Sequence, residues 1–286
     1  MFPAPLDRRP LAARAGYGAA VVAALAVWLL PLGAVVLTSI RSAADLNRGN
    51  FWGWPTEVRF LANYAAALSE SHLLQFALSS VLVTLPTVAA TVLISSMAGF
   101  ALAKHRFPGR RLVLATFVAG NLVPFQALMI PVRDLVIALG LYDSRWALIL
   151  FHTAFQTGFC TLLMRNFIRE LPEAVLDAAR LDGAGELRIF WHIVLPLVRP
   201  AMASVAVLVF TFVWNDYFWS LVLVQSDAVR PLTAGLQALR GMWQTSWQLV
   251  CAASVLAALP PVAVFFLMQR HLIAGLAVGR RKAAVR

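Results

Sequence analysis

Long apolar runs separated by short polar segments dominate this sequence of 286 residues. The first run, Tyr17–Ile40, is 24 residues long and carries no charge, which is enough for a helix to cross roughly 30 Å of hydrocarbon. Similar runs follow, and together they predict six transmembrane helices at about residues 17–40, 73–103, 112–132, 146–164, 201–226 and 244–269. The pattern therefore indicates an all-α integral membrane protein.

This pattern also divides the chain into three parts. A short polar segment, residues 1–16, precedes a six-helix domain at 17–273, and a basic tail, 274–286, closes the chain. Proline removes a backbone donor, so prolines inside the runs predict bends or breaks in the spans. These prolines are Pro86, Pro124, Pro131, Pro260 and Pro261.

Composition agrees with a membrane location. Apolar residues make up 60% of the chain and charged residues only 13%, about half the fraction of a soluble domain. The net charge of +11 invites a nucleic-acid hypothesis, but the basic residues sit in short segments between apolar runs and form no continuous stripe. The two cysteines, Cys160 and Cys251, lie within apolar runs and show no CxxC spacing, so we predict no disulfide framework. The five histidines also lack the spacing of metal ligands, so we predict no metal site.

The placement of the basic residues predicts an orientation. With the N-terminus inside, only seven of the 24 Lys and Arg residues fall outside: Arg41, Arg48, Arg59, Arg133, Arg145, Arg230 and Arg240. Basic residues concentrate in cytoplasmic segments of membrane proteins. We therefore expect both termini, and the segment 165–200, to be cytoplasmic.

The segment 165–200 between the fourth and fifth runs is too long and too charged for a tight turn. Pro172 suits the first position of a helix, and Gly183 can adopt φ > 0 just past its end. The sequence thus predicts a helix of about three turns, with Val175, Ala178 and Ala179 on one side. Such a helix fits the groove of another protein. A segment lying on lipid is the alternative, but small residues are poor lipid anchors.

A spaced motif runs through this segment. It consists of Asp177-Ala178-Ala179, then Gly183 after three residues, Ile193 after nine more, and Leu195-Pro196. It resembles the EAA---G---------I-LP motif of permease subunits of bacterial ABC importers, with Asp177 where Glu is usual. The stretches ALAKHRFPGR and WNDYFWSLVL resemble the carbohydrate-uptake, maltose-G-type branch of that family. The tail departs from the family pattern, reading GLAVGRRK where GLTAGAVKG is usual.

The resemblance implies a MetI-like ABC importer permease fold, with a cytoplasmic coupling helix between spans four and five. It implies a multi-pass subunit of the bacterial inner membrane that is not an enzyme and translocates a sugar or sugar-like solute. The implied partners are a second homologous permease, two copies of an ATP-binding subunit, an extracytoplasmic solute-binding protein and membrane lipid. Contact with the ATPase would fall to Asp177, Ala178, Ala179, Gly183, Ile193, Leu195 and Pro196.

No cofactor is expected in this chain, because a phosphate-binding loop requires Gly-Lys-Ser/Thr. Lys104 follows Ala103 and Lys282 follows Arg281. ATP and Mg²⁺ would therefore bind the partner ATPase.

Asp216 is the one carboxylate deep in a predicted span, where a charge should face protein or a water-filled cavity. With Asn215 and Tyr217 it suits hydrogen bonding and stacking to a sugar, and Asn121 and Gln126 in the third span are further candidates. The alternative role for these residues is polar contact between helices.

Three other hypotheses remain at this point. The solute of an importer need not be a sugar. An ion-coupled secondary transporter would require coupled intramembrane carboxylates or an inverted repeat, and the sequence has neither. A membrane-bound enzyme would require clustered His, Asp or Glu at the end of a span, which is also missing.

Overall fold

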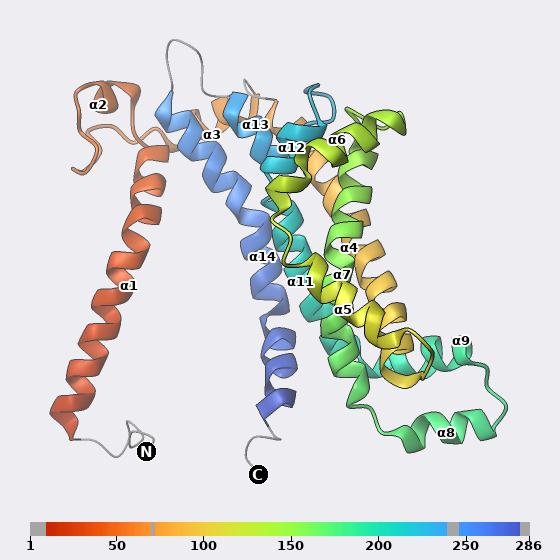
Figure 1. Ribbon diagram of the computed structural model, residues 1–286. Coiled ribbons are helices and arrows are strands. Elements are labelled where there is room, and N and C mark those ends of the chain that lie inside the picture. Colours follow the sequence, from red (N-terminus) through yellow and green to blue (C-terminus); the bar gives the residue numbers. More distant parts are fainter. Residues whose placement is uncertain (1–9, 70–71, 239–245, 281–286) are drawn as a thin grey trace. The chain divides into compact units, whose positions relative to one another are not determined.

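The computed structural model describes residues 10–69, 72–238 and 246–280, and these residues form helices and connections without a strand (Figure 1). One isolated antiparallel bridge joins Arg41 and Val58. The all-α prediction is confirmed for this part of the chain. Residues 1–9 of the predicted N-terminal segment and residues 281–286 of the predicted tail lie outside the described residues.

The helices follow one another along the described residues. In chain order they are α1 (Leu11–Ser39), α2 (Ala43–Asn47), α3 (Phe60–Ser69), α4 (Leu73–Lys104), α5 (Arg110–Gly120), η2 (Phe125–Leu128), α6 (Met129–Ala138), α7 (Arg145–Arg169), α8 (Glu173–Leu181), α9 (Glu186–Ile189), η3 (Phe190–Val194), α10 (Leu195–Leu197), α11 (Arg199–Trp214), α12 (Phe218–Leu223), α13 (Leu232–Ala238) and α14 (Trp247–Arg280). The segment η3 is a π-helix.

The chain divides into two compact units, one of residues 1–71 and 238–256, the other of residues 72–237 and 257–286. In the first unit α1 and α3 are joined at one end. The hydroxyls of Ser39 and Tyr64 lie 3.0 Å apart, and Nδ2 of Asn63 donates to the carbonyl of Ser39 at 2.9 Å. These bonds fix where α3 begins relative to the end of α1.

The core of the second unit is the packing of α4 against α7 and α11. The buried face of α4 is rich in small hydroxyl residues, namely Ser79, Ser80, Thr84, Thr87, Thr91, Ser95 and Ser96. Small residues let helix backbones approach closely in membranes. A Cβ at Gly99 would lie 2.9 Å from the backbone nitrogen of Arg165, so α4 and α7 nearly touch at that point.

Four helices of the described residues are long and apolar enough to cross a membrane: α1, α4, α7 and α14. Two bent helix pairs raise that number to six if each pair forms one span. The first pair, α5 with η2 and α6, bends by 97°. The span expected over 112–132, with a bend or break at its prolines, is broken here: α5 ends at Gly120, and Pro124, which offers no backbone N–H, precedes η2.

The expected continuous span at 201–226 is also broken. The helix α11 ends at Trp214, and α12 begins at Phe218. At the other end, Glu186–Leu197 and Arg199–Trp214 meet at an angle of 78°. Pro200 lies in the first turn of α11, where a missing N–H is tolerated.

Of the prolines expected to bend or break their spans, Pro124 lies at a helix break, whereas others lie inside continuous helices. Pro86 lies inside the continuous helix α4, and Pro260 and Pro261 lie inside α14. Neighbouring groups in a membrane protein can satisfy the backbone that a proline frees. Within the second unit, α8 and α9 lie at one end of the α4–α7–α11 bundle, and α6 and α12 lie at the other (Figure 1).

Candidate functional site

The end of α8 is a Schellman motif built on Gly183. Gly183 adopts φ +80°, its N–H donates to the carbonyl of Arg180, and the N–H of Ala184 donates to the carbonyl of Ala179, each at 3.0 Å. A Cβ on Gly183 would meet nothing within 4 Å. The requirement for glycine within this chain is therefore its backbone conformation and not close packing.

The helix α8 is held to the core by one side and exposes the other. Leu176 is fully buried and Ala179 packs partly against the core. Val175 is 44% exposed and Leu181 is 88% exposed, with Ala178 also exposed between them. The grouping of Val175, Ala178 and Ala179 on one side is thus only partly right, because Ala179 turns inward.

Ion pairs join the C-terminal end of α8 to the segment that follows. Arg180 donates to Oδ1 of Asp177 at 2.9 Å and to Oε1 of Glu186 at 2.8 Å. Nε2 of His105, just after α4, lies 3.4 Å from Oε2 of Glu186. The hydrogen bond from Arg180 lowers the pKa of Glu186, and the same bond raises the pKa of Arg180.

Lys104, the last residue of α4, holds the N-terminal end of α8. Its Nζ donates to the carbonyl of Leu171 at 2.7 Å and to Oε1 of Glu173 at 3.0 Å. The Lys104 side chain is 1% exposed, whereas that of Glu173 is 60% exposed. Adjacent residues at the end of α4 therefore contact both ends of the α8 segment.

The last three motif residues occupy a different position from the first four. Ile193 and Leu195 pack partly against the core beside fully buried Val194, and Pro196 is exposed. Ile193 lies within η3, and Leu195 and Pro196 lie in α10. Ile193 and Leu195 therefore pack the segment after α8 against the core. Asp177, Ala178 and Gly183, in α8 and at its end, are exposed.

A second site is a cavity of about 1130 Å³ in the same unit. Its walls come from the segment between α5 and η2, the start of η2, α7, α11, the α11–α12 connection and the start of α12. Aromatic residues are the largest group in the lining: Phe125, Phe151, Phe155, Phe159, Phe167, Phe212, Tyr217, Phe218 and Trp219. The polar lining residues are Asn121, His152, Gln156, Ser204, Thr211, Asn215 and Asp216.

Asp216 explains the break between α11 and α12. Its carboxylate accepts hydrogen bonds from the backbone N–H groups of Trp219 at 3.3 Å and Ser220 at 3.0 Å, and from the Ser220 hydroxyl at 3.0 Å. Nε2 of His152 on α7 lies 3.5 Å from Oδ2 of Asp216. With side chains 9% and 7% exposed, this buried pair ties the start of α12 to α7.

Four of the five predicted pathway residues line this cavity: Asn121, Asn215, Asp216 and Tyr217. Nδ2 of Asn215 donates to the carbonyl of Thr211 at 2.8 Å, and the hydroxyl of Tyr217 accepts from Nε2 of Gln237 at 2.8 Å. Nδ2 of Asn121 donates to the carbonyl of Phe117 at 2.6 Å. The fifth, Gln126, is exposed on η2 and is not part of the lining.

Sequence reasoning missed His152 and Gln156, which face the cavity one turn apart on α7. His152 was set aside because it has no ligand spacing. An available signal was its position: a histidine within one apolar run and an aspartate within another are candidates to pair, since ionisable residues in spans rarely lack a partner. Among the described residues, no group of three or more His, Cys, Asp or Glu side chains could hold a metal ion.

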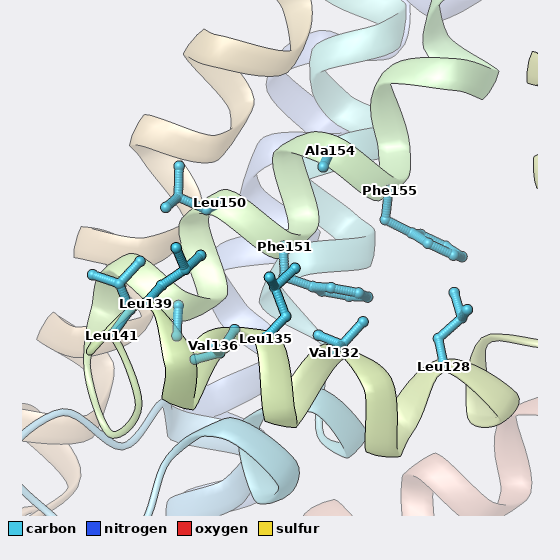
Figure 2. A pocket seen from close by; sticks show the side chains of 11 residues that line it. Leu128, Val132, Leu135, Val136, Leu139, Leu141, Leu150, Phe151, Ala154 and Phe155 are labelled. Atoms are coloured by element: carbon cyan, nitrogen blue, oxygen red, sulfur yellow. The ribbon is translucent and has the colours of Figure 1, made fainter.

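A smaller cavity of about 410 Å³ lies between α6 and α7 (Figure 2). Val132 and Leu135 of α6 point toward Phe151 of α7. Its lining is wholly apolar, and Phe151 and Phe155 line both cavities. These two rings therefore separate the larger, partly polar cavity from the apolar one.

A family model described as "Binding-protein-dependent transport system inner membrane component" matches residues 76–278. The osmoprotective compounds uptake permease protein GgtD of Synechocystis sp. is 34% identical over 263 residues, which cover 90% of this chain and 88% of GgtD. The arabinooligosaccharides transport system permease protein AraQ of Halalkalibacterium halodurans is 33% identical, over 92% of this chain and 93% of AraQ.

A solved structure is similar in fold. It is a chain of a bacterial ABC transporter involved in the import of the acidic polysaccharide alginate, with a TM-score of 0.80 and 25% sequence identity. The superposition covers 94% of this chain and 99% of that chain.

Proposed function

The chain belongs to the family of binding-protein-dependent transport system inner membrane components, and we propose that it carries a sugar or sugar-like solute through an ATP-driven importer. Its relatives are permease proteins and not enzymes. The MetI-like ABC importer permease fold expected from the motif is confirmed by the alginate transporter chain. What remains a proposal is the solute, the orientation and the contact with an ATPase.

The cavity is the observation that carries the proposal of a sugar. Aromatic faces stack on the apolar faces of sugar rings, and a few placed polar groups give orientation, which is the composition of this lining. Exposed Asn215, Tyr217 and Asn121 are the proposed solute contacts. Asp216 and His152 are proposed to support them, because the carboxylate already accepts bonds from α12.

The names of relatives support the sugar class, with one alternative. AraQ is named for arabino-oligosaccharides and the solved transporter for alginate, both carbohydrates. GgtD is named for osmoprotective compounds, which keeps a non-sugar solute as the second candidate. An ion-coupled secondary transporter has no support from these relatives.

The proposed mechanism is alternating access. A solute-binding protein outside the membrane delivers solute to this subunit and a second, homologous permease. Two ATP-binding subunits, which hold ATP and Mg²⁺, close on the cytoplasmic side. Their closure reaches the spans through α8.

Three observations support α8 as the contact with the ATPase. Val175 and Leu181 are exposed apolar side chains on a short helix, which suits a groove in another protein. Lys104 and His105 bind both ends of the segment to α4. Buried Leu176 holds its other side, so a push on α8 would reach the α4–α7 pair.

The count of basic residues supports an inside location for both termini and for α8. Reporter fusions after Ala67 and after Ala228 test it. Both sites should give activity only with a reporter that works in the periplasm. Activity of a cytoplasmic reporter at either site would contradict the orientation.

Uptake into vesicles tests the solute. The partner binding protein is first titrated calorimetrically with a panel of sugars and osmoprotective compounds. The assembled transporter, with ATP inside the vesicles, should then import the sugar that binds. Uptake without ATP but with an ion gradient would contradict the importer, and ATP-driven uptake of non-sugars alone would establish the second candidate.

A further inference from the structure

The connection between α2 and α3 exposes three large aromatic side chains. Phe51 is 52% exposed, Trp52 is 73% exposed and Trp54 is 86% exposed. Contiguous apolar surface of this kind on a protein marks a contact with another molecule. The described helices of the first unit do not cover these rings.

The aromatic residues are presented by a fixed backbone. Arg41 has a fully buried side chain whose Nη1 donates to the carbonyl of Asn50 at 2.7 Å and whose Nη2 donates to the carbonyl of Gly53. The side chain of Asn50 accepts from the N–H of Gly53 at 3.0 Å and donates to the carbonyl of Trp54 at 3.1 Å. These hydrogen bonds from a buried guanidinium to two loop carbonyls indicate that the loop has a defined conformation.

Arg41 also sets the depth of this loop. Arg41 lies two residues after Ser39, the last residue of α1. Nδ2 of Asn63 donates to the backbone carbonyl of Arg41 at 2.8 Å. The helix α1 is a candidate span, and its most apolar window has none of its residues buried within the structure. The carbonyls of Asn50 and Gly53 therefore lie within one arginine side chain of the end of a candidate span.

We propose that Phe51, Trp52 and Trp54 form an aromatic wedge that inserts into the headgroup region of the bilayer at the end of α1. Tryptophan favours this depth because its ring is largely apolar while its N–H still finds water or a headgroup. Arg41, two residues after the end of the candidate span α1, holds the loop that carries the wedge, and this position favours lipid over a soluble partner. The wedge fixes how deep α1 sits and does not depend on the solute.

Quenching by brominated lipid tests the wedge in the assembled transporter. The complex is placed in nanodiscs whose lipids carry bromine either near the headgroup or near the chain end. The signal of Trp52 and Trp54 is obtained by subtracting the spectrum of the double variant Trp52→Phe/Trp54→Phe. Trp28, 81% exposed within α1, is the matched control through Trp28→Phe.

Shallow bromine should quench the Trp52 and Trp54 signal at least twofold more than deep bromine, and Trp28 should show the reverse order. Arg41→Met, which removes both bonds to the loop, should reduce this contrast while Arg41→Lys reduces it less. Equal, weak quenching at both depths would overturn the proposal. So would equal quenching at both depths together with a change in Trp52 and Trp54 emission on adding the solute-binding protein, which would make the loop a protein-docking surface.

Discussion

Asp177 and Asp216 are identical side chains in opposite environments. Asp177 on α8 is 61% exposed and pairs with Arg180, which also binds Glu186, whereas Asp216 is 9% exposed and pairs with His152. Exposed ion pairs contribute about 0–1 kcal/mol, but removing one partner of a buried pair costs several. The exposed charged side chains Asp177 and Arg180 on α8 therefore contribute little to stability. The buried pair of Asp216 and His152 at the cavity is required for the folded structure.

What α8 cannot lose is its backbone shape and its attachment. Gly183 supplies the only conformation that closes the helix end as observed, and Lys104 binds the carbonyl of Leu171 from a buried position. We therefore expect substitutions that alter the backbone at Gly183 or the attachment through Lys104 to impair α8 more than removal of an exposed charge does. At the cavity the order is reversed.

The largest effect is expected from Asp216→Ala. It leaves the N–H groups of Trp219 and Ser220 and the ring of His152 without their acceptor, so we expect a loss of about 2–4 kcal/mol in the free energy of unfolding. Thermal unfolding of the purified subunit in detergent measures it. Asp216→Asn, which keeps one acceptor oxygen, should lose less, and an unchanged melting temperature for Asp216→Ala would remove the structural role.

Gly183→Val should come next. A β-branched residue at φ +80° costs about 1–2 kcal/mol locally and should abolish co-purification of the ATPase while membrane insertion stays normal. Gly183→Asn is the matched variant, because Asn tolerates this conformation. If Gly183→Asn assembles with the ATPase, the requirement at this position is the backbone conformation. If Gly183→Asn fails as Gly183→Val does, the requirement is close approach of the partner, because nothing in this chain lies within 4 Å of a Cβ at Gly183.

Lys104→Met should have an intermediate effect. The variant keeps the packing length but loses the bonds to Leu171 and Glu173, so we expect a severalfold drop in transport with ATPase hydrolysis less affected. Lys104→Arg should recover part of the coupling, and Glu173→Gln should change little, because Glu173 is largely exposed. Equal transport by Lys104→Met and wild type would show that α4 does not hold α8.

The smallest effect is expected from Asp177→Ala, because Arg180 keeps its bond to Glu186. Any effect of low pH on this segment should then come from protonation of Glu186, which would break its ion pair with Arg180. Its pKa is lowered by Arg180, so the pair stabilises the segment fully above the ordinary pKa of glutamate and is lost only as pH falls through the lowered value. ATPase co-purification should therefore be the same at pH 8 and pH 6 in the wild type and in Asp177→Ala, and a marked fall from pH 8 to pH 6 would contradict this assignment.

The sequence predicted α8 well because its signals are local. Pro172 precedes the helix and Gly183 closes it, each through the conformation of its own backbone. The cavity depended on contacts between distant residues. His152 and Asp216 meet only because α7 packs beside α11, and no spacing rule joins positions so far apart.

The prolines show the same limit. Pro124 marks a real helix break, while Pro86 and Pro260 lie in continuous helices. The residue alone removes a donor in each case, and the surrounding packing decides whether the helix continues. The fold class, the family and the break at Pro124 could be read from apolar runs, one motif and a proline, but the break of the fifth predicted span between Trp214 and Phe218 could not.

The π-helix Phe190–Val194 bears on how such chains change in evolution. A π turn holds one residue more than an α turn, so this segment accommodates a residue that a regular α-helix of the same length would not. Deleting one residue there would restore an α-helix and rotate the preceding segment by about 100° relative to α11. Fully buried Ile189 would leave the core. The spacing between Gly183 and Ile193 is therefore a length that natural variation can alter only at the cost of uncoupling α8 from the bundle.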